Sequence, residues 1–241
     1  MDTPEFDMIR PLDGAPRGTS LRRQIYQDLR EKLRRGEISA DEKLVDVDIA
    51  KAAGISRMPV REALLQLTIE GHLVGTTRGF ALPDLTDEDV ADIFEVRKLL
   101  EPRAAANATR DLDEDGMARL HQGMEMARKA VADGSAEALS DANIHFRETW
   151  IAALRNRRLA ATILRFADQA HVVRRDTLPD AETQQIVLDG LEAIFAAFVA
   201  RDAMAAHDHM TAFMYSAEDS FFRKSRGRPP YSDKTGDSPD E

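Results

Sequence analysis

The sequence has no cysteine among its 241 residues. This absence excludes disulfides, a thiolate nucleophile and sulfur-ligated zinc, and it fits a reducing cytoplasm. Long apolar runs are also missing, since the longest, residues 193–200, is far too short to cross a bilayer. Residues 1–7 are acidic where a secretory signal is basic. We therefore expect a cytoplasmic protein that does not engage a membrane.

Signatures of enzymes are scarce as well. The chain contains no glycine-rich phosphate loop, and no Ser/His/Asp or paired-carboxylate arrangement at helical spacing. Apolar residues make up 43% of the chain and aromatic residues 6%, a balance typical of a soluble, helix-rich protein. The length of the chain is enough for two domains.

What the sequence does contain is a pair of short helical segments joined by a tight turn, in residues 49–67. Gly54 stands where a residue after a helix takes positive φ, Ser56 can cap the next helix, and Pro59 falls in that helix's first turn. Four apolar residues recur at helical spacing and are predicted to face inward, namely Val60, Ala63, Leu64 and Leu67. The exposed N-terminal side of this helix then carries Ser56, Arg57, Met58 and Arg61. In helix-turn-helix proteins that side enters the major groove of DNA.

The flanking segments predict a winged helix-turn-helix. Upstream, apolar residues repeat every four positions and predict one more helix, at Leu21, Ile25, Leu29 and Leu33. Downstream, residues 70–82 predict two short strands around a turn between Gly75 and Gly79, with Arg78 at its tip. We therefore assign residues 18–83 to a winged helix-turn-helix domain that follows a flexible N-terminus of residues 1–17.

Residues 44–64, which end in Gly-Ile-Ser-Arg-Met-Pro-Val-Arg-Glu-Ala-Leu, resemble the GntR family of bacterial transcription regulators. The resemblance implies that DNA is contacted by the recognition helix and the wing tip, here Ser56, Arg57, Met58, Arg61, Thr77, Arg78 and Gly79. Two positions depart from the family pattern. Residues 40–41 are Ala-Asp instead of Pro-Gly, which should only loosen a turn, and Val47 replaces an arginine. We therefore expect one DNA contact of the family to be absent.

The net charge of −10 fits a DNA-binding protein only when it is divided along the chain. Residues 18–83 hold 11 basic against 9 acidic side chains, and residues 1–17 hold 2 against 4. The rest of the chain therefore carries a charge of −10. Repulsion between this acidic part and DNA should suppress non-specific binding.

From residue 84 on, the sequence predicts one helix after another. Thr86 can cap a long helix whose apolar face carries Ile93, Val96, Leu99 and Leu100. Five further periodic segments follow, at residues 116–132, 136–154, 158–174, 181–200 and 203–223. We assign residues 84–223 to an all-α effector-binding and dimerisation domain, and residues 224–241 to a disordered tail.

Residues 95–101 and 141–147, followed by Asn156, resemble the FCD domain, the C-terminal effector domain of the FadR class of GntR regulators. The resemblance implies a bundle of six or seven helices that dimerises and binds small carboxylates in a central cavity, often through a metal ion. In that family the metal is held by an aspartate, a histidine four residues later, and two histidines from the last two helices.

Asp141 and His145 are spaced i,i+4 and project from one helix face, as half of such a metal site requires. Alignment to the family pattern places Leu191 and Phe213 where the two later histidines would lie, and apolar side chains cannot ligate. His209, one turn before Phe213, could substitute if the helix register shifts. Otherwise Asp141 and His145 form a buried charge-assisted hydrogen bond. We expect no cofactor, and at most a degenerate metal site at Asp141 and His145.

Arg97 lies on the otherwise apolar face of the first bundle helix, where an unpaired guanidinium is costly. Its anionic partner is either Asp141, in a structural ion pair, or the carboxylate of an effector, which the FCD resemblance favours. We therefore predict effector contacts from Arg97, Asp141 and His145. Arg174 and Arg175 are predicted to be surface charges.

The tail contains Arg-Gly-Arg-Pro at residues 226–229, the core of the AT-hook, which lies in the narrow minor groove of A·T-rich DNA. The composition of residues 223–241, rich in Pro, Gly, Ser and charge, equally fits a solubilising disordered tail, and on composition that second interpretation is favoured.

These features predict a transcription regulator, most simply a repressor. It would bind a short palindromic operator in double-stranded DNA as a homodimer and respond to a small organic acid. Two alternatives stay open. One is a constitutive DNA-binding protein whose bundle only dimerises, and the other is a helical metal- or carboxylate-dependent enzyme fused to a DNA-targeting head.

Overall fold

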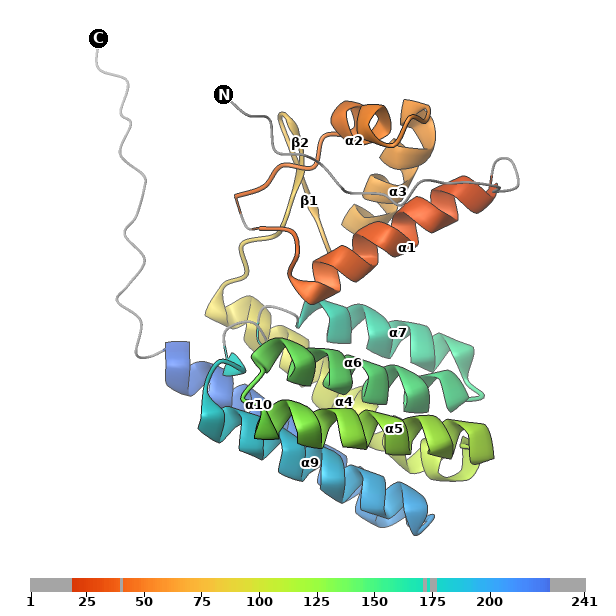
Figure 1. Ribbon diagram of the computed structural model, residues 1–241, viewed down its shortest axis with the longest axis vertical. Helices are drawn as coiled ribbons and strands as arrows, with labels where there is room; N and C mark the ends of the chain where they lie inside the picture. Colours follow the sequence, from red (N-terminus) through yellow and green to blue (C-terminus); the bar gives the residue numbers. More distant parts are fainter. Residues whose placement is uncertain (1–18, 40, 171–172, 174–176, 226–241) are drawn as a thin grey trace.

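The computed structural model describes residues 19–39, 41–170, 173 and 177–225. These residues form two bodies, a small winged body and a larger helical bundle (Figure 1). The mainly α architecture predicted from the sequence, a winged helix-turn-helix followed by an all-α bundle, is confirmed. Several sequence predictions fall outside the described residues: the N-terminus 1–17, Arg174 and Arg175, and the Arg-Gly-Arg-Pro motif of the tail.

The winged body contains three helices and a two-stranded antiparallel sheet, in the order α1 (Thr19–Arg35), α2 (Asp46–Ala52), α3 (Arg57–Ile69), β1 (Val74–Thr76) and β2 (Gly79–Ala81). Seven of the eight apolar residues predicted to face inward from α1 and α3 are buried in its core, and Leu21 is partly buried against it. The full core consists of Ile25, Leu29, Leu33, Ile38, Leu44, Ile49, Ala50, Val60, Ala63, Leu64, Leu67, Leu73 and Phe80. Backbone hydrogen bonds between Leu44 and Phe80 attach the wing to the segment before α2. The wing is therefore fixed to the same core as α3.

Two glycines have conformations that the turns of this body require. Gly54 has φ +65° after α2, as the sequence predicted, and it lets the chain reverse into α3. Gly79 has φ +129°, and a Cβ there would lie 2.6 Å from the carbonyl oxygen of Leu44. A side chain at residue 79 would therefore force the wing away from the segment that holds it.

The bundle consists of long helices packed side by side (Figure 1), namely α4 (Asp87–Asp111), α5 (Glu114–Ala132), α6 (Ala136–Ala153), α7 (Arg157–Gln169), α9 (Ala181–Val199) and α10 (Ala203–Ser225). Side-chain caps begin several of these helices, and Thr86 forms the predicted cap of α4 as a full capping box with Asp89. Asn156 accepts hydrogen bonds from Arg158 and Leu159, which explains why α7 begins directly after it. None of the described helices has the length and apolar character needed to cross a membrane.

The inward face of α4 differs from the predicted one. Leu99, expected on the buried face, is 70% exposed, whereas Phe94, Arg97 and Glu101 are buried. The steps of three and four residues from Phe94 define the inward stripe, and this stripe includes two charged residues. The predicted face is therefore right for Ile93 and Arg97, which are buried, and wrong for Leu99.

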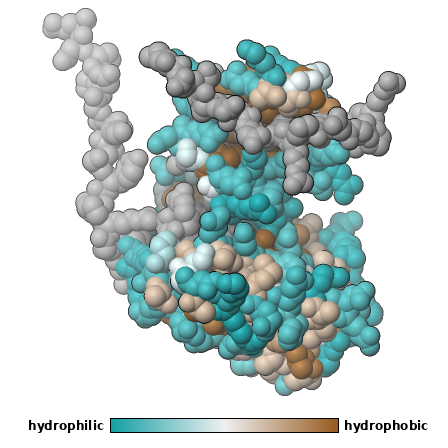
Figure 2. Space-filling view, viewed as in Figure 1, coloured by the Kyte–Doolittle hydropathy of each residue, from teal (hydrophilic) through white to brown (hydrophobic). Residues whose placement is uncertain are grey.

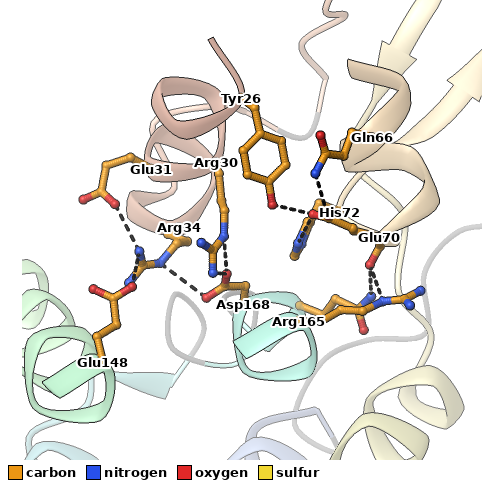
Figure 3. A network of polar contacts seen from close by, with 11 residues as sticks. Tyr26, Arg30, Glu31, Arg34, Gln66, Glu70, His72, Glu148, Arg165 and Asp168 are labelled. Carbon is orange, nitrogen blue, oxygen red and sulfur yellow. Dashed lines mark hydrogen bonds and ion pairs between the residues drawn. The ribbon is translucent and has the colours of Figure 1, made fainter. Parts of the chain in front are cut away.

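A buried carboxylate joins the two bodies (Figure 3). Asp168, in the last turn of α7, is 2% exposed and faces α1. Arg30 Nε donates to Asp168 Oδ2 at 2.8 Å, and Arg34 Nε lies 3.3 Å from Asp168 Oδ1. Burial raises the pKa of Asp168, but the charges of Arg30, Arg34 and Arg147 outweigh this effect and hold the pKa below its ordinary value of 3.8. Asp168 is therefore ionised at neutral pH.

Helix α7 also holds the C-terminal end of α3. Arg165 Nε and Gln169 Nε2 both donate to the carbonyl oxygen of Glu70 at 2.8 Å, and Arg165 Nη2 donates to that of Ile69 at 3.1 Å. The last carbonyls of a helix have no partner within it, so side chains from the bundle complete the end of α3. The hydroxyl of Tyr26 donates to the Glu70 carboxylate at 2.5 Å on the same side (Figure 3).

The junction between the bodies is polar. The described apolar side chains form separate clusters within the winged body and within the bundle. The outer surface is also hydrophilic over much of the face seen in Figure 2. Ion pairs and hydrogen bonds, which require specific geometry, therefore set how the winged body sits on the bundle.

Replacing Asp168 with asparagine should destabilise the protein by about 3 kcal/mol or more, because the change leaves Arg30 and Arg34 without their buried counter-charge. The pKa of Asp168 is lower in the folded protein than in the unfolded chain. The ionised side chain therefore stabilises the fold above the ordinary carboxyl pKa, and this stabilisation is lost as pH falls through the pKa of the folded state. Thermal unfolding between pH 7 and pH 3 measures both effects.

The matched control is Asp219→Asn, which makes the same chemical change at an exposed residue of α10. We expect it to melt like the wild type at every pH. If Asp168→Asn melted like Asp219→Asn, the buried ion pair would not hold the two bodies together.

Candidate nucleic-acid interface and ligand pocket

The N-terminal end of α3 presents the predicted recognition residues together. Ser56, Arg57, Met58 and Arg61 are all exposed, while the apolar side of the same helix is buried in the core of the winged body. Ser56 occupies the N-cap position, but its side chain makes no capping hydrogen bond, so the predicted cap is wrong in this respect. The Ser56 hydroxyl is therefore available to another partner.

The wing supplies the second group of predicted contacts. Thr77 and Arg78 are exposed at the turn between β1 and β2, and Gly79 is half-buried beside them. The hydroxyl of Thr76 donates to the carbonyl of Gly79 at 3.1 Å and accepts from the N–H of Arg78 at 3.3 Å. These bonds shape the tip that carries Arg78.

Asp46 is buried beneath this surface, in contact with its arginines, and the sequence interpretation missed it. Arg57 Nε donates to Asp46 Oδ2 at 2.9 Å, and Arg61 Nη1 donates to the same oxygen at 3.4 Å. Burial raises the pKa of Asp46. The hydrogen bond from Arg57 and the charges of Arg57 and Arg61 lower it by more, so the pKa is below its ordinary value. The signal in the sequence was an acid at the start of α2 opposite two arginines of α3.

A pocket opens in the bundle between α4, α6, α9 and α10. Its wall is mostly apolar, with a few polar groups: Phe94, Arg97, Asn143, Arg147, Ala170, Val173, Thr177, Leu178, Thr183, Ile186, Val187, Phe213, Met214, Ala217 and Ser220. Arg97 was predicted to face such a cavity, whereas Asn143 and Arg147 were not. Two guanidinium groups, those of Arg97 and Arg147, thus reach this pocket.

Arg97 has a structural partner that the sequence interpretation did not consider. Its Nε donates to Glu101 Oε1 at 2.6 Å, within α4, and both side chains are buried. Its guanidinium also lies 5.3 Å from the ring centre of Phe94. The partner of Arg97 is thus Glu101 and not Asp141, and Arg97 is neutralised without a ligand.

Arg147 is in a different situation. It is 5% exposed, and its Nε and Nη2 atoms have no hydrogen-bond partner among the described residues. Burial, together with the nearby charge of Arg97, lowers the pKa of Arg147 to about 10. A buried cation with free N–H groups is unfavourable unless an anion completes it.

Asp141 and His145 do not contribute to the pocket wall. Both are half-buried, and His145 Nε2 lies 3.2 Å from the carbonyl oxygen of Arg119 on α5. The inward pair of α6 is instead Asn143 and Arg147, with the same i,i+4 spacing but two residues later. A shift of two residues rotates a side chain by roughly 200° around a helix, to the other side. Asp141 and His145 are therefore not placed in this pocket, and their contact with an effector stays a prediction.

The pocket does not fit a metal ion. A guanidinium stands at Arg147 and an amide at Asn143, while Phe213 lines the wall and Leu191 is buried in the apolar core. His209 is exposed on α10 and does not replace a ligand. Across the described residues, no group of three or more His, Cys, Asp or Glu side chains could hold a metal. A positive guanidinium favours an anion at this place, not a cation.

Comparison with protein families agrees with both halves of the structure. Residues 21–79 match the model of the bacterial regulatory proteins of the gntR family, and residues 92–216 match the FCD domain. The chain is 27% identical over 191 residues to the HTH-type transcriptional regulator YdhC of Bacillus subtilis, covering 78% of this chain and 85% of that protein. It is 30% identical over 138 residues to the HTH-type transcriptional regulator McbR of Escherichia coli, covering 57% and 62%.

The gluconate operon transcriptional repressor of Bacillus subtilis is 28% identical over 148 residues, which cover 61% of this chain and 60% of that protein. Solved structures show the same fold. McbR/YncC of E. coli superposes with a TM-score of 0.75 at 24% identity, over 86% of this chain and all of that one. A GntR regulator from Rhodococcus sp. RHA1 gives 0.72 at 20% identity, over 85% and 99%. The chain therefore belongs to the GntR family of bacterial regulatory proteins, with an FCD domain as its C-terminal part, and is a DNA-binding transcription regulator.

Proposed function

We propose that this regulator is a repressor whose operator binding is controlled by a small organic anion held in the bundle pocket. The observation that carries the proposal is Arg147, a buried guanidinium with free N–H groups in a mostly apolar pocket. The name of the gluconate operon repressor supports the sign of regulation. The winged body ends at β2 and α4 begins at Asp87, which supports a boundary between domains 18–83 and 84–223.

The pocket favours a carboxylate attached to an apolar body. A carboxylate matches the fork of a guanidinium and can accept two parallel hydrogen bonds from Arg147. Val173, Ile186, Val187 and Met214 offer apolar contact for the rest of the molecule. Arg97 is already paired with Glu101, so we assign it a supporting role in orienting the ligand rather than the main contact.

The end of α7 offers a route from the pocket to the DNA-binding domain. Ala170 and Val173 line the pocket, and the residues just before them, Asp168 and Gln169, hold the winged body. A ligand that shifts this segment would alter the ion pair with α1 and the bonds at the end of α3. Ligand binding and DNA binding would then be coupled through one element with discrete arrangements.

A homodimer completes the proposal. Two copies would present two α3 helices to the two halves of a short palindromic operator, so a change in how each winged body sits on its bundle would alter their separation. Ser56, Arg57, Met58 and Arg61 would enter the major groove, and the wing tip with Thr77, Arg78 and Gly79 would contact the adjacent backbone.

Replacing Arg57 or Arg61 with alanine should reduce operator affinity by about 1–3 kcal/mol if the side chain contacts a guanine edge. Both residues are exposed, but they neutralise the buried carboxylate of Asp46, so the melting temperature should fall modestly while the fold is kept. Footprinting and titration against a duplex selected by the wild type measure the loss. Wild-type footprints from both variants would contradict the assignment of α3 as the recognition helix.

Replacing Arg147 with methionine should abolish binding of organic anions while leaving ligand-free DNA binding intact. The change removes a buried charge without a hydrogen-bonded counter-ion, so the melting temperature should hold or rise. Thermal shifts with butyrate, hexanoate and benzoate measure ligand binding, and the uncharged amides of the same acids are the matched probes. DNA titration with each active acid then shows whether the operator complex weakens.

The contrasting variant is Arg97→Ala, which leaves Glu101 buried without its partner and should lower the melting temperature. A wild type that no carboxylate stabilises, and whose DNA binding no carboxylate alters, would favour a constitutive DNA-binding protein. Turnover of a bound acid would favour the enzyme alternative.

A further inference from the structure

We propose that Asp46 is a positioning residue for DNA reading, and that its buried carboxylate orients the guanidinium groups of Arg57 and Arg61 before DNA is bound. Asp46 is 5% exposed and opens α2, whereas both arginines belong to the first two turns of α3. One carboxylate oxygen therefore connects the two helices of the motif at the end that faces DNA. The inference rests on the proposed use of α3 as the recognition helix.

The shorter of the two contacts, between Arg57 and Asp46, leaves the two Nη groups of Arg57 free to bind a base. Arg57 donates to Asp46 through Nε at 2.9 Å, and the side chain is still 55% exposed. A guanidinium is planar, so a hydrogen bond at Nε restricts the orientation of the whole group. The two Nη groups then form an outer edge that can donate two parallel bonds to O6 and N7 of guanine. Asp46 thus sets Arg57 as a reader of guanine.

Arg61 is held differently. It donates to Asp46 through Nη1 at the longer distance of 3.4 Å, so its terminal edge is already partly used and its plane is less constrained. A group held in this way suits a phosphate oxygen, which makes weaker demands on orientation than a base edge. The two arginines therefore have different roles: Arg57 contacts a base and specifies sequence, and Arg61 contacts the phosphate backbone of DNA.

The burial of Asp46 keeps this arrangement compatible with DNA. The two guanidinium groups stand between its carboxylate and the outside, since Asp46 is buried and both arginines are exposed. Ordering a long arginine side chain opposes binding, and an arginine ordered beforehand avoids this cost when DNA arrives. The charge of Asp46 then strengthens specific binding without adding an exposed negative group near the phosphates.

The test compares Asp46→Asn with Asp48→Asn. Asp48 is an exposed acid in the same turn of α2, so its variant loses the same charge nearby. A consensus duplex is first selected from a randomised pool with the wild type. Affinities for that consensus and for a scrambled duplex are then measured at one salt concentration. We expect Asp46→Asn to lose about fivefold or more on the consensus and nothing on the scrambled duplex, and Asp48→Asn to keep the wild-type ratio.

A base analogue identifies the contact. Substituting 7-deazaguanine, which lacks the N7 acceptor, at each consensus guanine should weaken the wild type at one position of each half-site. At that position, 7-deazaguanine should reduce the affinity of the Asp46→Asn variant only slightly below its affinity for the unmodified duplex. Asp46→Glu, which keeps a carboxylate, should recover part of the discrimination, and an Arg57→Ala background should remove the effect of Asp46→Asn.

Three results would overturn the inference. The first is a ratio of consensus to scrambled affinity that is unchanged in Asp46→Asn, with wild-type selection intact. The second is a parallel loss on both duplexes with a lowered melting temperature, which assigns Asp46 a structural role only. The third is a wild type that enriches no sequence, which would overturn the proposed function as well.

Discussion

The ion pair between Asp168 of α7 and the two arginines of α1 is the contact on which the arrangement of the molecule depends. Each body packs its own apolar core, and the described apolar clusters do not extend across the junction. Charges and hydrogen bonds therefore decide how the winged body sits on the bundle. Buried ion pairs stabilise only while their geometry is kept, so such a junction favours a few discrete arrangements over a continuous range. The proposed control of DNA binding by a ligand would need this property.

The same physical requirement, that a buried charge needs a partner, organises the rest of the structure. Glu101 neutralises Arg97 inside α4, and Asp46 neutralises arginines that α3 presents to the outside. Arg147 differs in having no ion pair among the described residues. Its Nε and Nη2 atoms lack hydrogen-bond partners there, as those of Arg34 do, but Arg34 is ion-paired with Asp168 and Glu148. In the part of the chain that the structure describes, Arg147 in the wall of the pocket is thus a buried charge without an ion-pair partner, and an anionic ligand would supply one.

The pocket also explains why the family's metal chemistry does not carry over to this chain. Arg147 and Asn143 occupy the inward side of α6, with the spacing that an aspartate and a histidine have in the family pattern, and Phe213 faces the same space from α10. A fixed guanidinium binds carboxylates directly, with directional hydrogen bonds, and so it can replace a metal ion as the anion-binding group. The ligand proposed for this pocket is thus of the same anionic class as in the family pattern, with a guanidinium in place of the metal ion.

The sequence by itself determined the fold class, the winged helix-turn-helix and the exposed residues at the start of α3. Periodicity, cap residues and turn glycines act over a few residues, so they can be recognised without the rest of the chain. Only the tertiary structure decided that Asn143 and Arg147 face the pocket instead of Asp141 and His145. It also decided that Asp168 pairs with Arg30, 138 residues away. The rotation of a helix and the pairing of distant charges depend on the packing of the whole bundle, and a shift of two residues hardly alters a local pattern although it turns a side chain to the opposite face.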